Sequence, residues 1–147
     1  MPEPMLTLAP LIRMLYILIG ITLVVHIISA IGLYSMAIKR NIENAWFVWI
    51  PILQMYIMGK LVMKFKIVNF EIQQPEIILP ITGIAVGLGN LASVVGTIIY
   101  FFALYRLFCL YKPDKAQIYT ILSIVLPFMG AIFIFILRNE EAKLEVI

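Results

Sequence analysis

Residues 77–105 contain no charged side chain, and this stretch constrains the fold more than any other. A helix needs about 20 apolar residues to cross the hydrocarbon of a bilayer, so this stretch is long enough. Gly83 and Gly87 form a G-x-x-x-G step, and Gly89, Ala92 and Gly96 add further small side chains. Small residues at helical spacing let two membrane helices approach closely. We therefore expect residues 77–105 to be the central helix of a membrane bundle, with these five residues packed against a neighbour.

The composition of the whole chain supports the same class of protein. Of its 147 residues 63% are apolar and 13% charged, whereas a soluble domain has roughly 45–50% and about 25%. The length allows one domain. The basic residues behind the net charge of +3 lie beside apolar stretches and are not interleaved with aromatic side chains. They therefore indicate interface anchors and no nucleic-acid partner. We expect a single integral membrane domain over 1–147 that contacts the lipid bilayer.

Length and hydropathy predict four helices, at about 14–38, 45–63, 77–105 and 116–137. A polar loop over 64–76, extended or folded as a short hairpin, precedes the third helix, and 138–147 forms a short tail. Pro51 interrupts the backbone hydrogen bonding of the second helix. That helix therefore either crosses with a kink at Pro51 or re-enters the side it came from. The predicted fold class is an all-α membrane protein, a bundle of three to four transmembrane helices.

The number of spans is not settled by the positions of Lys and Arg. Four spans place five basic residues on one side and six on the other, whereas three spans with 45–63 re-entrant place seven against four. The second arrangement agrees better with the rule that basic residues face the cytoplasm. A shift of 71 positions superimposes several residues, including Gly59 on Gly130, as a tandem duplication would. That pattern favours four membrane-embedded helices, and both counts stay open.

Polar side chains inside the apolar stretches form a candidate intramembrane site. His26 lies at the middle of 14–38; Asn90, Ser93 and Thr97 share a face of 77–105; Ser123 lies within 116–137. Polar groups at membrane depth face partners or water, so we expect these faces to meet. Their side chains either form interhelical hydrogen bonds or, because histidine titrates near neutral pH, line a path for protons or small solutes.

Catalytic and metal-binding patterns are missing from the sequence. There is no H-E-x-x-H, no G-x-S-x-G and no pair of intramembrane carboxylates, and the chain has one histidine and one cysteine, Cys109. A zinc site within one chain is therefore not expected, and neither is an intrachain disulfide. We expect no enzyme activity and no cofactor.

Three stretches resemble a group of small, uncharacterised multi-spanning membrane proteins of Gram-positive bacteria, grouped as domains of unknown function. The stretches are LYSMAIKRNIENAWFVWIPILQMYIMGKL at 33–61, NFEIQQPEIILP at 69–80, and ALYRLFCLYKPDKA with LPFMGAIFIFILRN at 103–139. The resemblance implies a bacterial plasma membrane and supplies no activity, substrate or catalytic residue.

Two functions remain after these exclusions. The first is a non-enzymatic membrane protein that acts through helix–helix or partner contacts, as an accessory subunit, a scaffold or an immunity-type protein. Its partner is a second copy of the chain or another membrane protein. The second is a small oligomeric channel, a holin-like pore or a transporter subunit, in which the polar faces line the path.

Overall fold

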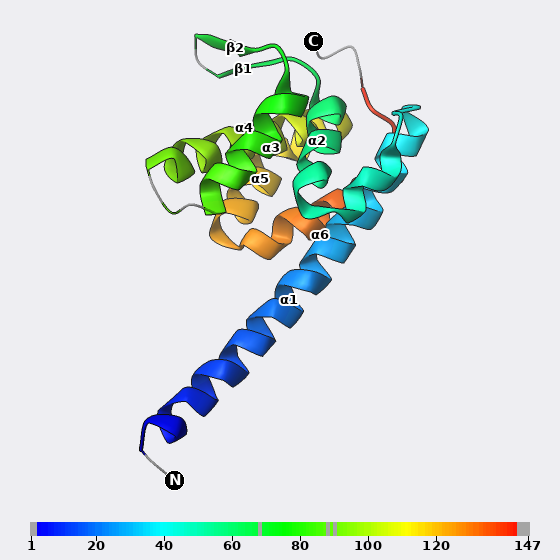
Figure 1. The fold of residues 1–147 in the computed structure, drawn as a ribbon. Coiled ribbons are helices and arrows are strands. Elements are labelled where there is room, and N and C mark those ends of the chain that lie inside the picture. Colours follow the sequence, from blue (N-terminus) through cyan, green and yellow to red (C-terminus); the bar gives the residue numbers. More distant parts are fainter. Residues whose placement is uncertain (1–2, 68, 88, 90, 144–147) are drawn as a thin grey trace.

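The computed structural model of the chain describes residues 3–67, 69–87, 89 and 91–143, which are mostly helical (Figure 1). In order, the elements are α1 (Glu3–Lys39), the 3-10 helix η1 (Ala45–Trp49), α2 (Pro51–Val62), β1 (Phe65–Ile67), β2 (Phe70–Ile72), α3 (Pro75–Gly87), α4 (Leu91–Tyr111), the 3-10 turn η2 (Pro113–Lys115), α5 (Ala116–Val125) and α6 (Pro127–Leu137).

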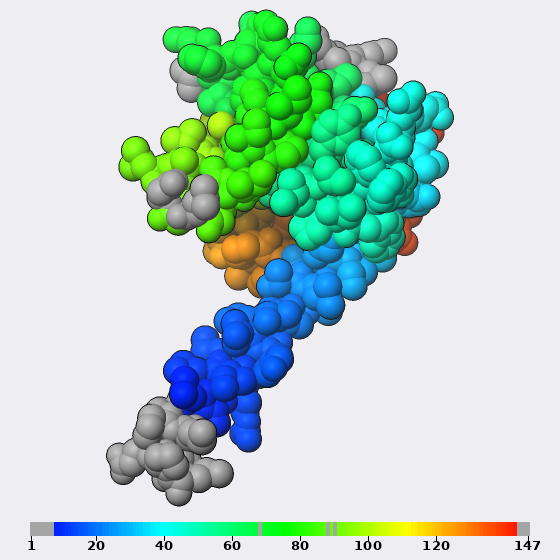
Figure 2. Space-filling view, viewed as in Figure 1, coloured from blue at the N-terminus to red at the C-terminus, as the bar shows by residue number. Residues whose placement is uncertain are grey.

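The longest element, α1, divides into an exposed half and a packed half. Every residue from 8 to 24 is exposed, and this half stands clear of the other helices (Figures 1 and 2). Leu33 and Met36, further along, are buried. The helix ends at Lys39, shortly before Asn41, whose φ of 51° lies in the left-handed region that commonly terminates a helix. The predicted helix over 14–38 therefore lies within α1.

The second predicted helix, over 45–63, is interrupted at Ile50. This residue is extended, with φ −100° and ψ 120°, and Pro51 follows it as the first residue of α2. Proline fits there because a helix start leaves its first N–H groups unbonded in any case. The interruption that Pro51 predicts is confirmed. With 12 residues, α2 is about 18 Å long, shorter than the ~30 Å of hydrocarbon in a bilayer.

The prediction of one central helix over 77–105 is wrong, because two antiparallel helices occupy this stretch. Helix α3 ends at Gly87 and α4 begins at Leu91. Between them Gly89 has a φ of 62°, which glycine adopts without steric cost. The chain then folds back, so that a Cβ added to Gly96 would lie 3.0 Å from the carbonyl oxygen of Thr82. The glycine-rich stretch therefore makes a turn, and α4 continues beyond 105 to Tyr111.

The prediction of one last helix over 116–137 is also wrong. Helix α5 ends at Val125, Leu126 is extended, and Pro127 begins α6. Proline disfavours the helical conformation of the residue before it, which ends α5 here. Both backbone groups of Leu126 remain bonded, since its N–H donates to Leu122 and its carbonyl accepts from the N–H of Met129, each at 2.8 Å.

The loop over 64–76 contains a short antiparallel hairpin, one of the two forms that the sequence allowed. Phe65 pairs with Ile72, and Lys66 pairs with Glu71. Phe65 and Ile72 are buried while Lys66 and Glu71 are exposed, because successive side chains of a strand point to opposite faces. The hairpin therefore covers the ends of the helices with its apolar side.

The ends of most elements gather at one end of the molecule, which we call the charged end. Lys39 Nζ donates to the carbonyl of Arg138 at 2.9 Å, which joins the last residue of α1 to the residue that follows α6. Lys112, after α4, forms an ion pair with Glu140 at 3.0 Å. The charged end comprises residues 39–44, 64–67, 69–74, 112–115 and 138–143, and Figure 1 shows the hairpin and the end of α1 at the same end of the molecule.

The buried side chains lie between the charged end and the interruptions of the helices. The largest fully buried ones come from α1, η1, α2, α3, α4 and α6: Phe108, Leu33, Met36, Ile57, Leu61, Leu79, Leu104, Leu107, Leu110, Leu137, Val48 and Val62. Two helical stretches, Leu8–Lys39 and Leu91–Tyr111, are long and apolar enough to cross a membrane by length and composition.

Candidate functional site

A polar junction joins α1 to the interruption between η1 and α2. His26 Nε2 lies 3.1 Å from the carbonyl oxygen of Trp49, the residue before the interruption. Because a carbonyl only accepts, His26 donates this bond and carries a proton on Nε2. Ser29 Oγ donates to the carbonyl of His26 at 2.9 Å, and Gln54 Nε2 donates to Ser29 Oγ at 2.7 Å. The junction thus connects three elements through side chains.

The position of the junction explains why it is polar. An interrupted helix leaves carbonyls without intrahelical partners, and in an apolar surrounding each needs a donor. His26 supplies one for Trp49, on a chain segment 23 residues away. Ser29, Gln54 and Tyr100 also line a cavity of about 110 Å³ beside the junction. These contacts agree with the interpretation that His26 makes an interhelical hydrogen bond. The sequence analysis did not predict that Gln54 lies beside it.

The remaining predicted polar residues lie at other places in the fold. Thr97 Oγ1 donates to the carbonyl of Ser93 at 2.8 Å within α4, beside a groove toward α3. Ser123 is buried and donates to the carbonyl of Tyr119 at 2.7 Å within α5. Asn90 lies outside the described residues. The hydrogen bonds of Thr97 and Ser123 thus stay within their own helices, whereas that of His26 joins two elements.

The predicted packing residues separate into two groups. Gly83 faces Met55 of α2, and Gly96 lies against Thr82 and Val86 of α3. A Cβ added at Gly87 or Gly89 would meet no atom within 4 Å, and Ala92 is exposed.

Two further close contacts, both against backbone atoms, are made by glycines outside the predicted packing residues. A Cβ on Gly59 of α2 would lie 2.6 Å from the carbonyl carbon of Pro75, and one on Gly32 of α1 would lie 2.8 Å from the backbone of Ile134 in α6. Neither is part of a G-x-x-x-G step, so spacing alone gave no signal for them.

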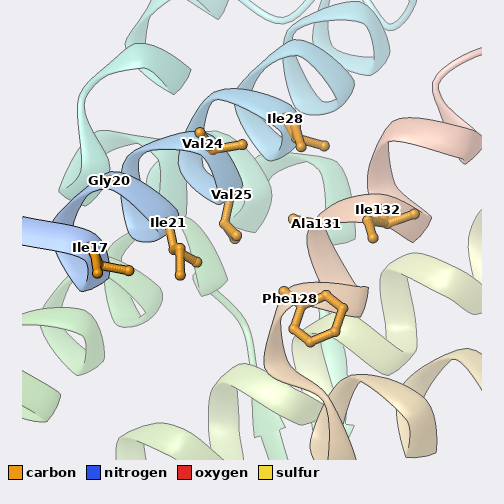
Figure 3. Close-up of a pocket in the computed structure, with 9 residues that line it drawn as sticks. All are labelled: Ile17, Gly20, Ile21, Val24, Val25, Ile28, Phe128, Ala131 and Ile132. Carbon is orange, nitrogen blue, oxygen red and sulfur yellow. The ribbon is translucent and has the colours of Figure 1, made fainter. Parts of the chain in front are cut away.

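An apolar groove of about 480 Å³ lies between the exposed half of α1 and helix α6. Figure 3 shows Ile21 and Val25 of α1 and Phe128 of α6 around the same gap. Gly20 lies at the groove with nothing within 4 Å of an added Cβ. The groove contains almost no polar surface, so it can receive an acyl chain or an apolar helix and does not offer groups for chemistry.

The part of the chain that the structure describes contains no group of three or more His, Cys, Asp or Glu residues that could hold a metal ion. Cys109, on α4, is partly buried and free. In comparisons with protein-family models, curated proteins and solved structures, no match to this chain was found.

Proposed function

We propose that this chain is an integral membrane protein of the bacterial plasma membrane that acts without catalysis, through contacts with another membrane helix. The observation that carries the proposal is the exposed half of α1. Only 6% of the most apolar 18-residue window of this helix is buried. A helix that is apolar all round requires a protein core or a bilayer, and the low burial favours a bilayer. Residues 8–24 measure about 26 Å along the axis, close to the hydrocarbon thickness.

The shorter helices fit a bilayer as re-entrant pairs. Helices α3, α5 and α6 have 13, 10 and 11 residues, which makes each about 15–20 Å long against ~30 Å of hydrocarbon. Each pair, η1–α2, α3–α4 and α5–α6, leaves the charged end and returns to it. Interrupted backbone is tolerated at membrane depth where protein covers it or its groups are bonded, as at Leu126 and at Trp49. Helix α4 is long enough to cross, but it folds back along α3 toward the charged end, so in this arrangement α1 alone spans.

In this arrangement the positive-inside rule, by which Lys and Arg stay on the cytoplasmic side, predicts one orientation of the protein. The chain has 11 Lys and Arg residues, and all except Arg13 lie at or beside the charged end. Since Lys and Arg are retained on the cytoplasmic side, the charged end faces the cytoplasm and the N-terminal end of α1 faces the opposite side. The three-span and four-span counts divided these residues more evenly because both assumed that the stretches 77–105 and 116–137 cross.

The groove between α1 and α6 supports a function through partner contacts. It is apolar, it opens beside Gly20, and a glycine there lets a second helix approach closely. The partner is a second copy or another membrane protein, for which the chain serves as an accessory subunit, scaffold or immunity-type protein. The alternative of a channel requires polar faces along a common path. The local hydrogen bonds of Thr97 and Ser123 favour the partner interpretation.

Cysteine labelling tests the proposed topology. Starting from a Cys109→Ser background, single cysteines replace Glu43, Gln73, Asp114 and Asn139 in turn, all of which are exposed. We expect a membrane-impermeant maleimide to label all four in inside-out vesicles and none in right-side-out vesicles. Four crossing helices predict instead that positions 43 and 114 react from one side and positions 73 and 139 from the other. That pattern would overturn the re-entrant arrangement.

Crosslinking tests the proposed partner surface. Gly20→Cys in the same background places a thiol in the groove, and Leu23→Cys, also exposed on α1 but not part of the groove lining, is the matched control. We expect oxidation in native membranes to give a discrete adduct from position 20 and little from position 23. Equal adducts from both positions would contradict a specific contact at the groove.

A further inference from the structure

Another cavity lies at the charged end, and we call it the polar cavity because charged side chains line part of it. It is open, measures about 610 Å³ and lies between the hairpin and residues 102–106 of α4. Lys64 and Lys66 line it from the hairpin and Arg106 from α4, together with the carboxylate of Glu71. Three positive charges and one negative charge leave a net charge of about +2 at neutral pH. The cavity is therefore suited to an anion.

The local structure explains why the cations share one cavity. Lys64 and Lys66 are two residues apart at the start of the hairpin, so their side chains lie on the same side, while Phe65 between them is buried. Lys66 is opposite Glu71 in the hairpin register. Arg106 is partly buried and comes from a helix that contacts β1. The site thus exists only when the hairpin is folded against α4.

An apolar groove continues from this cavity between α4 and α5. It measures about 320 Å³ and is lined by α4 residues including Ile98, together with Thr120 and Ile124 of α5. Phe102 and Tyr105 line both the groove and the polar cavity. The groove therefore begins at the polar cavity and runs along α4 away from the charged end.

We infer that the two cavities form one binding site for an anionic phospholipid. Lys64, Lys66 and Arg106 hold the phosphate, since ammonium and guanidinium groups donate strong hydrogen bonds to phosphate oxygens. Glu71 accepts hydrogen bonds from headgroup hydroxyls. One acyl chain lies along Ile98, in the groove, where it replaces bulk lipid.

The shape of the site favours a lipid over a free phosphate ion. A phosphate ion would use the polar cavity alone and gain nothing from the apolar groove that adjoins it. A lipid matches both parts in the order in which the membrane presents them, with the headgroup at the cytoplasmic surface and the chain toward the hydrocarbon. The inference rests on the membrane location proposed above.

A charge-matched pair of variants tests the headgroup contacts. Lys64→Gln/Lys66→Gln removes two charges from the cavity, and Lys115→Gln/Lys143→Gln removes two exposed charges elsewhere at the charged end. Binding of phosphatidylglycerol to the purified full chain is titrated by native mass spectrometry, with phosphatidylcholine for comparison. A direct hydrogen bond to a charged group is worth about tenfold or more in affinity, so we expect the first pair to lose at least about tenfold. We expect less than about threefold for the control. Equal losses would mean general attraction by charge and would overturn the site.

The apolar half of the site is tested separately. Ile98→Trp fills the groove, and Ile118→Trp, also exposed but on α5 outside the groove, is the control. We expect only the first to weaken phosphatidylglycerol binding, and excess inorganic phosphate to leave binding unchanged. Displacement by phosphate together with no effect of Ile98→Trp would show that the site takes phosphate ions and not a lipid. Thermal melts show whether each variant is folded.

Membrane extraction separates the failure of this inference from the failure of the proposed function. If the chain leaves the membrane in alkaline carbonate, the proposed function is wrong, and the lipid site with it. If the chain stays in the membrane and the variants bind phosphatidylglycerol as the wild type does, the lipid site alone is wrong.

Discussion

The contact between α2 and α3 gives the sharpest prediction, because it depends on one missing methyl group. A Cβ on Gly59 would lie 2.6 Å from the carbonyl carbon of Pro75 and closer still to backbone atoms of Glu76. Ordinary van der Waals contact begins at 3.4 Å. The obstructing atoms belong to the backbone at the start of α3, so a rotamer change cannot relieve the overlap. In the variant Gly59→Ala, α3 must move away from α2.

The magnitude follows from the size of that movement. A shift of about 0.8 Å loses a quarter to a half of the dispersion energy of the atoms it separates. Overpacking by one methyl group typically costs about 1–3 kcal/mol, while alanine is favoured over glycine by about 1 kcal/mol inside a helix. Because the overlap is with backbone atoms that cannot move separately, we place the overpacking cost in the upper part of that range, about 2–3 kcal/mol, so that Gly59→Ala should lower the free energy of unfolding by about 1–2 kcal/mol. Gly20→Ala, which meets nothing within 4 Å, should raise it by up to about 1 kcal/mol.

The chain contains its own probe for this measurement. Cys109 is the single cysteine and is partly buried, so a dye that fluoresces on reacting with a thiol reports unfolding in detergent micelles. The melting temperature of Gly59→Ala should fall below that of the wild type, and that of Gly20→Ala should stay level or rise. A variant Gly59→Ala as stable as the wild type would mean that α2 and α3 do not approach as described.

Two further predictions concern polar contacts. His26→Ala leaves the carbonyl of Trp49 without its donor and should lower the free energy of unfolding by about 0.5–1.5 kcal/mol in the same melt. His26→Gln keeps a donor at similar reach and should recover most of this loss, so equal losses from the two variants would contradict the hydrogen bond. The hydrogen bond and the charge of Glu140 raise the pKa of Lys112 above its ordinary value of 10.5, so the stability that this pair contributes is complete below pH 10.5 and disappears as the pH rises through the raised pKa. Glu140→Gln should therefore melt earlier than the wild type at neutral pH and match it well above pH 10.5, and a difference that persists at high pH would contradict this origin.

The polar contacts of α1 show where sequence reasoning about the candidate site succeeded. The position of His26 within a long apolar stretch was enough to predict a partner for its side chain, because an unpaired polar group is costly there. The identity of the partner was not predictable. The bond goes to the backbone of Trp49, and a backbone carbonyl has no sequence signature. It also exists only because the chain is interrupted one residue later.

The sequence by itself determined which stretches are apolar, where basic residues stop them, and that proline interrupts the helix at Pro51. These properties are local, since they depend on side-chain transfer energies and on the missing N–H of proline. It also allowed the hairpin, as one of two forms of the polar loop over 64–76.

Only the tertiary structure decided that α3 ends at Gly87 and α5 at Val125, and that the chain returns to one end. Glycine and proline are tolerated inside membrane helices when neighbours bond the freed backbone groups, so the same residues are compatible with a straight helix, a kink or a turn. Helices that are apolar on all sides also lack the periodicity that would reveal which face packs. The choice is made by contacts between elements, such as Gly96 against Thr82 and Gly59 against Pro75. Close packing of this kind depends on which backbones meet in space, and that is a property of the folded chain alone.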